Sequence, residues 1–328
     1  MSHPKSLRSA IFSHDNDYGF HPCDESLKPA RLSVSCIVPY YETGPLARLC
    51  LGQISRALAH YRAQFPGHHL KTQILVMDDG STARPFAELV DDLDAQVTLI
   101  RSAKNRGRSA TRNEGLARSA GFDIALFVDS DVLIADGHVS RICELCSSSE
   151  GGASFTERIV ASFFATLRKP LTQAEIPAAL SQASARMDWR WRCVFQPTWL
   201  GTESDWIYVG RQFALVEETN YFRSWRGMVG PWSLPNMVLG GCFAVPVGPS
   251  LRVGGFDESF DRYGFTETTL VAKLIGAGVS VIPQLKAAAL HAEWNPNHQH
   301  QADRNIHFRK AHRQFYCDYL RRPHDSTN

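Results

Sequence analysis

Asp129 and Asp131, two aspartates separated by one residue, have the type and spacing of a metal-binding pair. They follow Ile124–Val128, an apolar run with the length and composition of a buried strand. Because side chains alternate along an extended chain, residues i and i+2 share a face and can reach the same ion. Carboxylate oxygens favour Mg²⁺ or Mn²⁺, whose remaining positions are filled by water and by substrate phosphates. Such triplets are common in turns, so it is the preceding strand that makes this pair a candidate metal site.

A basic segment precedes this pair. Residues 101–118 contain six basic residues against one acidic residue, Glu114. The six are Arg101, Lys104, Arg106, Arg108, Arg112 and Arg118. Arg108 and Arg112 lie one turn apart at the start of a predicted helix, where both can face an anion held near the helix N-terminus. We expect Arg112 to contact a phosphate, and we expect Lys104, Arg106 and Arg118 to be solvated.

Alternating apolar and helical segments supply the elements that would position these side chains. Strands are predicted at residues 34–38, 73–77, 97–100 and 124–128, and helices at 44–64, 84–93 and 108–120. This βαβαβαβ order predicts the α/β class, with a doubly wound, mostly parallel central sheet. Ligands of such sheets bind beyond the carboxyl ends of the strands. Those ends carry polar residues at 39–42, 78–81, 101 and 129–131.

The composition is that of an ordinary folded protein. The chain has 328 residues, 44% hydrophobic and 21% charged, enough for two domains or one enlarged α/β domain. A net charge of +2 gives no overall field that would attract nucleic acid, so we expect no such partner. No apolar run approaches the roughly 18 residues that span a bilayer, and the N-terminus lacks a secretory pattern. We therefore expect a cytoplasmic protein whose eight cysteines are reduced and mostly buried.

Five motifs in order resemble glycosyltransferase family 2, the nucleotide-sugar-dependent enzymes with a GT-A fold. They are Val34–Glu42, Val76–Ser81, Asn105–Gly115, Phe127–Asp131 and Gly254–Phe260. The resemblance extends over residues 32–139 and resumes from 239 to 291. It implies a GT-A (Rossmann-like) fold, in which a large insertion forms the acceptor side, and an enzyme that transfers glycosyl groups.

The resemblance also implies where the donor, a nucleotide diphosphate sugar, would bind. The nucleotide would lie across the strand ends, with uridine as the expected nucleoside. Pro39, Tyr40 and Glu42 would lie near the base and the ribose. Asp79 would hydrogen-bond the base.

A metal ion is implied at the diphosphate of this donor. Asp131, helped by Asp129, would hold Mn²⁺ or Mg²⁺, and Arg112 would stabilise the charge that develops on the leaving β-phosphate. His291 follows the strand-like residues 287–290, where many GT-A enzymes have a third metal ligand. A single histidine after an apolar run is equally compatible with a structural role.

An inverting transfer also needs a base that takes the proton of the acceptor hydroxyl. The family places this base in a Trp-Gly-Gly-Glu-Asp type segment, which Tyr263–Leu270 matches. Glu267 falls where the family has its catalytic aspartate, and Thr266 where it has glutamate. We expect Glu267 to be the base, since it keeps a carboxylate with one more methylene. The alternative is that Glu267 only stabilises the first turn of a helix.

Five regions are expected along the chain. They are an irregular N-terminal arm (1–30), a nucleotide-sugar-binding α/β half (31–150), a Trp-rich insertion (151–235), the catalytic-base half of the GT-A domain (236–295) and a basic C-terminal helix or tail (296–328). The insertion holds six of the seven tryptophans, and indole rings can stack on sugars. Its candidates for acceptor contacts are Trp189, Trp191 and Trp232, with Arg186, Arg190, Arg192 and Arg211 suited to an acidic acceptor.

The C-terminal region is basic and aromatic, with Phe308, Phe315 and Tyr319 at near-helical spacing. We interpret it as a helix packed on the core. The alternatives are a lid over the diphosphate and a peripheral contact with an anionic membrane surface, at the inner face of the membrane. Four histidines fit no ligand pattern and are expected at the surface: His298, His300, His307 and His312.

The sequence therefore predicts an inverting, metal-dependent transfer of one sugar to an acceptor hydroxyl. The acceptor stays open between a glycan, a lipid-linked sugar and a natural product. A Gln-x-x-Arg-Trp segment and a membrane span, which processive synthases carry, are missing, and this favours single-sugar transfer. One alternative is a catalytically inactive GT-A module that binds sugar or a protein partner, which Thr266 favours. Another is a nucleotidyltransferase, for which residues 39–44 offer no lysine.

Overall fold

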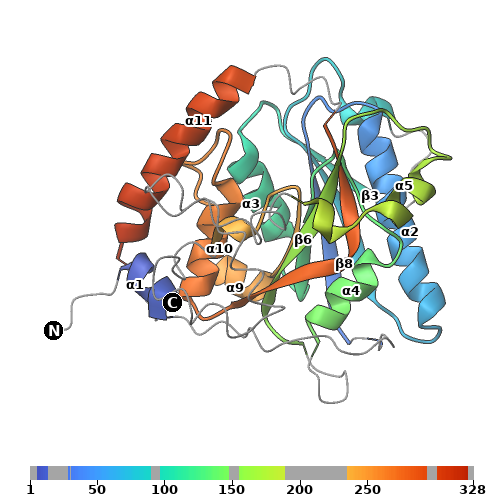
Figure 1. Cartoon of the computed structure of the whole chain (residues 1–328), viewed down its shortest axis with the longest axis horizontal. Helices are drawn as coiled ribbons and strands as arrows, with labels where there is room; N and C mark the ends of the chain where they lie inside the picture. The colour runs from blue at the N-terminus through green and yellow to red at the C-terminus, as the bar shows by residue number, and fades with distance from the viewer. Residues whose placement is uncertain are drawn as a thin grey trace.

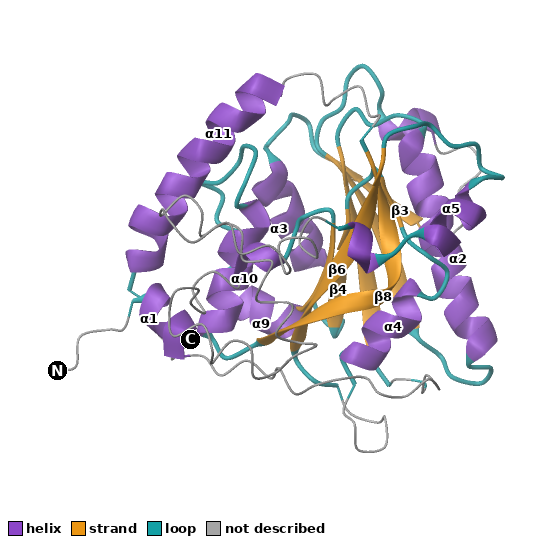
Figure 2. Cartoon of the chain, in the orientation of Figure 1, coloured by secondary structure: helices purple, strands orange, loops and turns teal. Residues whose placement is uncertain are grey.

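The computed structural model describes residues 6–13, 29, 31–89, 97–147, 155–188, 235–293 and 301–323. Within them a central sheet is covered by helices on both faces (Figures 1 and 2). One face carries α2 (Leu46–Gln64), α4 (His138–Leu145) and α5 (Ile176–Gln182). The other carries α3 (Arg108–Arg118), α9 (Val247–Arg252) and α10 (Thr266–Gly276), with α11 (Gln301–Arg313) outside them.

The described residues form one eight-stranded sheet in the order β3-β2-β1-β4-β7-β6-β8-β5. The strands are β1 (Ser33–Tyr40), β2 (Lys71–Asp78), β3 (Val97–Arg101), β4 (Ile124–Val128), β5 (Val132–Leu133), β6 (Arg158–Leu167), β7 (Cys242–Pro246) and β8 (Ser280–Ala292). β3, β2, β1 and β4 are parallel, and their register puts Tyr40, Asp78 and Arg101 side by side at the carboxyl edge. The predicted α/β class, with a doubly wound and mostly parallel sheet, is confirmed.

The second half of the sheet mixes strand directions. β7 is antiparallel to both β4 and β6, whereas β8 is parallel to β6 and antiparallel to β5. The strand-like residues 287–290 are part of the longer strand β8, which begins at Ser280. Its pairing with β6 shifts register between Ser162 and Phe164, and beyond this shift His291 lies opposite Val132 of β5.

The helix predicted at residues 84–93 is wrong over its described part, which contains only the 3₁₀ turn η1 (Phe86–Leu89). The reason is local competition for the backbone. The carboxylates of Glu42 and Asp78 accept hydrogen bonds from the amides of residues 82–84 and of Phe86. These amides therefore bond to side chains and do not form the backbone hydrogen bonds of a helix. Residues 90–96 lie outside the described residues.

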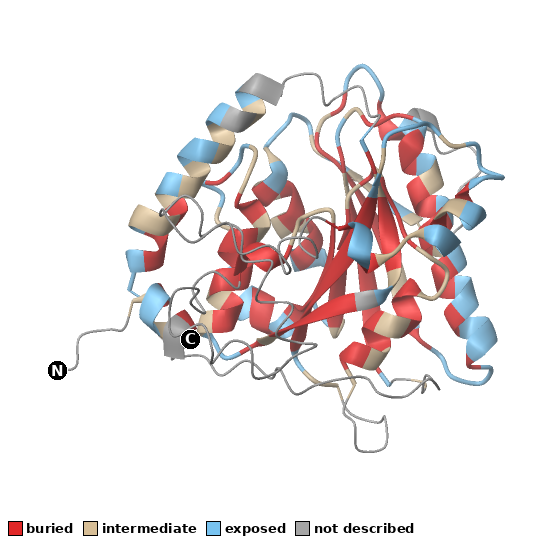
Figure 3. Cartoon of the chain, in the orientation of Figure 1, coloured by how far each residue is buried: buried red, intermediate tan, exposed pale blue. Residues whose placement is uncertain are grey.

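Two hydrophobic clusters fill the space on the two faces of the sheet, and Figure 3 shows the buried residues concentrated in the strands and in the helix faces toward them. α3 approaches the sheet closely at Gly115, where an added Cβ would lie 2.6 Å from Ile37 Cγ2. Arg112 lies one turn earlier on the same helix face, and it is only 2% exposed. Close packing of α3 thus buries a guanidinium at the edge of the sheet.

Part of the arm expected to be irregular is helical. α1 (Leu7–Ser13) begins with an amide that donates to the carbonyl oxygen of Arg322 at 3.0 Å, and Leu7 and Ile11 are buried. The N-terminal helix thus packs beside the C-terminal segment, because its two apolar residues share one face.

The cysteines at positions 36, 50, 143, 146 and 242 are buried. Burial raises the pKa of the Cys36 thiol to about 12, which leaves it protonated and unreactive at neutral pH. Among the helices that the structure describes, none is long and apolar enough to cross a bilayer.

His138, at the start of α4, is fully buried and hydrogen-bonded at both ring nitrogens. Nδ1 lies 2.9 Å from the carbonyl oxygen of Ala287 in β8, and Nε2 lies 3.1 Å from Ser162 Oγ in β6. A carbonyl can only accept, so Nδ1 carries the proton of the neutral ring. Burial lowers the pKa of His138 to about 4, and the bond to Ala287 opposes this only in part.

Protein stability is expected to depend on pH through His138. The pKa is 6.5 in an unfolded chain and about 4 here, so the stabilisation is present above pH 6.5 and is lost as the pH falls toward 4. This should remove up to about 3 kcal/mol from the free energy of unfolding. His138→Gln should show a smaller loss, because an amide does not titrate. Denaturant unfolding of both proteins across this window makes the comparison, and an equal loss in both would contradict the assignment.

Candidate active site

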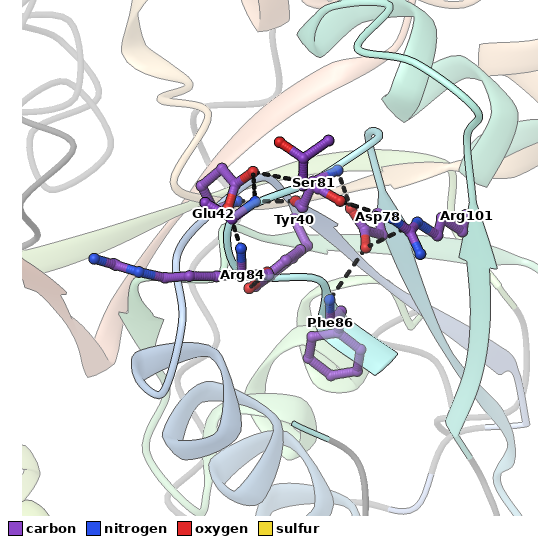
Figure 4. A network of polar contacts seen from close by, with 9 residues as sticks. Tyr40, Glu42, Asp78, Ser81, Arg84, Phe86 and Arg101 are labelled. Carbon is purple, nitrogen blue, oxygen red and sulfur yellow. Dashed lines mark hydrogen bonds and ion pairs between the residues drawn. The ribbon is translucent and has the colours of Figure 1, made fainter. Parts of the chain in front are cut away.

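The loop after β2 is held by side chains from two strand ends (Figure 4). Asp78, which has no exposed surface, accepts hydrogen bonds from the amides of Ser81 at 2.9 Å and Phe86 at 3.1 Å. Arg101, at the end of β3, donates to the carbonyl oxygen of Ser81 at 2.8 Å. These contacts fix residues 79–86 at the carboxyl edge of the sheet.

Glu42 and Tyr40 hold the same loop from β1 (Figure 4). Glu42 accepts hydrogen bonds of 2.6–3.0 Å from the amides of residues 82–84. Burial raises the pKa of the Glu42 carboxyl, but the three amide bonds together lower it below its usual value. The Tyr40 hydroxyl donates to the carbonyl oxygen of Arg84 at 2.5 Å and accepts from the amide of Gly44 at 3.1 Å. With 1% of its surface exposed, Tyr40 supports the loop from beneath, whereas Glu42 remains partly accessible.

Asp79 connects this loop to the start of α3. Its Oδ1 accepts from the amide of Arg106 at 2.8 Å, and its Oδ2 accepts from the amide of Gly107 at 2.9 Å. The two loops touch, since a Cβ on Gly80 would lie 2.5 Å from the carbonyl carbon of Lys104. Each carboxylate oxygen has two lone pairs and accepts one of these bonds, so each oxygen of Asp79 keeps capacity for one further donor.

Arg112, which is buried, forms an ion pair with the partly exposed Asp129 at the end of β4. Arg112 Nη2 lies 2.6 Å from Asp129 Oδ1 and 3.3 Å from the carbonyl oxygen of Gly240. Arg112 Nε and Nη1 are buried, and neither has a hydrogen-bond partner among the residues that the structure describes. Buried donors without an acceptor are rare in folded proteins. The guanidinium therefore has spare hydrogen-bonding capacity at the carboxyl edge.

Asp131 and His291 come together where β5 pairs with β8. His291 Nε2 lies 3.8 Å from Asp131 Oδ1, and both side chains are partly exposed. The turn between the aspartates is fixed by the 2.6 Å hydrogen bond between Thr43 Oγ1 and Ser130 Oγ, and by the Asp129 amide, which donates to the carbonyl oxygen of Gly241 at 2.9 Å. Asp131 is thus held beside His291, whereas Asp129 is turned toward Arg112.

Glu267 lies in the first turn of α10 and reaches the same place from the opposite side. A Cβ added to Gly240 would lie 3.0 Å from Glu267 Oε2 and 3.2 Å from Arg112 Nη2. The carboxylate and the guanidinium therefore converge on Gly240. Thr266 points elsewhere, since its hydroxyl lies 3.2 Å from the carbonyl oxygen of Phe260.

Glu267 and Arg112 thus meet at Gly240, and Asp129 is hydrogen-bonded to Arg112 at the same edge of the sheet. Two residues that shape the site were not predicted from the sequence. Asp78 precedes Asp79 in an Asp-Asp pair at a strand end, which is the signal that could have identified it. Gly240 had no such signal, because its role is to leave room for two side chains.

Several predicted contacts cannot be compared with the structure. Trp189, Trp191, Trp232, Arg190, Arg192, Arg211, His298 and His300 lie outside the described residues. Arg186 is described and exposed, and His307 and His312 are partly exposed on α11.

The fold and the edge together define a class. A central α/β sheet with an acidic pair after β4 and a further carboxylate at the start of α10 is a GT-A glycosyltransferase architecture. Residues 35–194 match the family model of glycosyl transferase family 2. Enzymes of this family transfer glycosyl groups, and the expected class of enzyme is confirmed.

Known proteins resemble the chain in sequence and in structure. An N-acetylglucosaminyltransferase of Bradyrhizobium elkanii is 28% identical over 134 residues, which are 40% of this chain and 68% of that protein. A structure of GalNAc-T7 with UDP, GalNAc and Mn²⁺ has a TM-score of 0.54 at 12% identity, over 90% of this chain and 49% of that one. Staphylococcus aureus TarS has a TM-score of 0.46 at 15% identity, over 80% of this chain and 37% of that one. The chain thus spans half or less of these two solved chains, and the likeness to GalNAc-T7 concerns the fold alone.

Proposed function

We propose that this protein transfers a single sugar from a UDP-linked donor to an acceptor hydroxyl, with inversion at the sugar carbon. The observation that carries the proposal is the meeting of Arg112 and Glu267 at Gly240, with Asp129 paired to Arg112 and Asp131 close to His291. A guanidinium, two aspartates and a separate carboxylate are the groups that such a displacement requires. The relative from Bradyrhizobium elkanii is named as an N-acetylglucosaminyltransferase, which makes UDP-GlcNAc the first donor to examine.

Asp131 and His291 fit a divalent metal ion. Their 3.8 Å separation allows both to reach one ion, and one carboxylate with one imidazole suits Mn²⁺ better than Mg²⁺. No group of three His, Cys, Asp or Glu side chains in the described ranges could hold a metal by itself. The remaining positions would therefore be taken by water and by diphosphate oxygens. When bound, the ion would supply positive charge to the leaving diphosphate.

Arg112 and Asp129 act on the same leaving group. Asp129 binds Nη2 of Arg112 and so orients the guanidinium, while Nε and Nη1 meet no acceptor in the described part of the chain. A β-phosphate oxygen is a negatively charged hydrogen-bond acceptor, which suits these two N–H donors of a guanidinium. A fixed guanidinium stabilises the charge of the transition state without reorganising as it forms. Asp129 thus contributes mainly by holding Arg112, and its second oxygen remains for the metal.

Glu267 is proposed as the general base. Its carboxylate lies beside Gly240, where Arg112 Nη2 also lies. An acceptor hydroxyl between Glu267 and the sugar carbon would lose its proton to Glu267 as the new bond forms. Thr266 does not weaken this proposal, because its hydroxyl lies within hydrogen-bond distance of the Phe260 carbonyl and faces away from the edge.

Asp79→Ala is expected to raise the donor KM more than it lowers kcat. The carboxylate holds the amides of residues 106–107, and with them the loop that would line the nucleotide, in the ground state and the transition state alike. Steady-state kinetics with the active donor measure both constants. A large fall in kcat at constant KM would assign Asp79 to the chemical step.

The test of the proposal is a donor screen. UDP-GlcNAc, other UDP-sugars and GDP-mannose are incubated with the full chain and Mn²⁺, and release of the nucleoside diphosphate is measured with and without a chelator. Turnover that depends on metal and on one class of donor supports the proposal. Binding of nucleotide without turnover of any donor would favour the alternative, an inactive GT-A module.

A further inference from the structure

Phe265, immediately before α10, adopts a left-handed backbone conformation with φ 61° and ψ 7°. A bulky side chain disfavours this region, which is ordinarily taken by glycine or asparagine. Such a conformation persists only where the surrounding structure holds it, and it is often found at functional sites. The residue stands two positions before Glu267.

The C-terminal region supplies the surroundings that hold Phe265. The Phe265 ring is only 3% exposed and is enclosed by rings of α11 and of the following turn η6 (Gln314–Asp318). Ring centroids lie at 5.1 Å for Phe315, 5.5 Å for Phe308, 5.7 Å for His312 and 6.1 Å for Tyr316. Aromatic pairs at these separations are attractive beyond the area they bury.

The backbone of the turn also meets α11 directly. Gly264 has φ 101°, and an added Cβ would lie 2.9 Å from Phe308 Cδ2 and 3.4 Å from Phe308 Cα. One residue earlier, the guanidinium of Arg304 lies 4.2 Å from the centre of the Tyr263 ring. α11 thus contacts three consecutive residues, 263–265, and no side chain would fit between Gly264 and Phe308.

The direction in which α10 leaves this turn decides where Glu267 points. The other side of the turn is tied to α3, because Ser109 Oγ donates to the carbonyl oxygen of Phe260 at 2.9 Å and Thr266 Oγ1 lies 3.2 Å from the same oxygen. With both sides held, the first turn of α10 brings the Glu267 carboxylate to Gly240 and Arg112.

We propose that Phe265 and Phe308 are positioning residues, through which the C-terminal helix holds the turn before α10 and so directs the Glu267 carboxylate toward the acceptor hydroxyl. The inference rests on the proposed role of Glu267. It gives α11 a function in catalysis although α11 lies on the outside of the molecule (Figure 1).

Phe308→Leu in the full chain tests the proposal. The smaller side chain keeps an apolar contact but releases the ring pair with Phe265. We expect kcat to fall about 10- to 100-fold, since small misplacements of a reacting group have effects of this size. Donor KM and nucleotide affinity should stay unchanged, because the donor contacts lie on other loops. Phe308→Tyr keeps the ring and should restore the wild-type kcat.

Phe65→Leu is the matched control. Phe65 ends α2, packs on Tyr61 with ring centroids 4.9 Å apart and is 9% exposed, so its loss removes a comparable ring contact far from the turn. Its melting temperature should fall much as that of Phe308→Leu does, while its kcat stays unchanged. Equal losses of kcat in the two variants would overturn the inference, since general destabilisation would then explain both.

The Glu267→Gln background separates the inference from the proposed function. If Phe308 acts through Glu267, Phe308→Leu has no further effect on the residual single-turnover rate of Glu267→Gln. A full additional loss in that background, or a wild-type kcat in Phe308→Leu alone, overturns the positioning role and leaves the proposed base intact. A wild-type rate in Glu267→Gln overturns the base itself, and the positioning role with it.

Discussion

Glu267→Gln is expected to reduce kcat by about 10²- to 10⁴-fold, the usual effect of losing a general base. The amide preserves the shape of the side chain and its place beside Gly240, but it cannot take a proton. Affinities for nucleotide and metal should be nearly unchanged, because neither depends on this carboxylate. Rapid-quench or steady-state measurements of sugar transfer, with calorimetric titration of UDP in the presence of Mn²⁺, give both quantities. Transfer at the wild-type rate would remove Glu267 from the mechanism.

Two variants sharpen this experiment. Glu267→Asp keeps a carboxylate with a shorter reach, so part of the activity should remain. Glu258→Gln is the matched control. The Glu258 carboxylate accepts a hydrogen bond from Asn113 Nδ2 at 2.9 Å, whereas the Glu267 carboxylate lies at Gly240. The kcat of Glu258→Gln should stay close to that of the wild type. If kcat fell as much in Glu258→Gln as in Glu267→Gln, the negative charge of the region would explain the loss, and Glu267 would not be assigned as the base.

Asp131→Asn is expected to abolish metal-dependent donor binding and turnover while leaving the fold intact. The substitution removes one negative charge from a partly exposed site at the edge of the sheet and keeps the side-chain volume. Mn²⁺ affinity should fall by more than about 100-fold, because substitutions of residues that merely support a metal ligand already cost about 10- to 100-fold. Titration of Mn²⁺ followed by electron paramagnetic resonance measures this without any turnover.

Asp136→Asn is the control for loss of a carboxylate near the same strand. Asp136 pairs with Arg56 at 3.1 Å on the surface, and neither residue belongs to the site. Its Mn²⁺ affinity should match that of the wild type. Unchanged affinity in Asp131→Asn would exclude Asp131 as a ligand, and loss of affinity in both variants would indicate a general electrostatic effect.

The parallel half of the sheet could be predicted because each of its strands and helices is encoded by a short, continuous segment of the sequence. Each strand from β1 to β4 is a short apolar run, and α2 and α3 show helical periodicity between them. Parallel order then follows from the handedness and length of the crossovers, and the order places residues 40–42, 78–79 and 129–131 at one edge.

The rest of the fold depends on contacts between distant parts of the chain. β8 contains Gln284 and Lys286 and changes register against β6, so its sequence resembles two short strands and not one long one. At the site, Glu42 and Asp79 were predicted to contact the nucleotide, and in the structure both accept hydrogen bonds from backbone amides of neighbouring loops. Asp78, which was not predicted, does the same. Residue type indicates that a carboxylate accepts hydrogen bonds, but only the folded chain shows which donors it meets.

The pairing of β5 with β8 has a consequence for how this protein folds and opens. β5 has two residues and lies at the end of the sheet, and it joins Asp131 to His291 from a far later part of the chain. Such a contact requires the closure of a very long loop, and short edge strands are the elements that open at the lowest free energy. The two proposed ligands would therefore separate in a local opening that leaves the parallel strands folded. A ligand bound between them draws the equilibrium toward the closed form by mass action, so an occupied site would stabilise the pairing of β5 with β8.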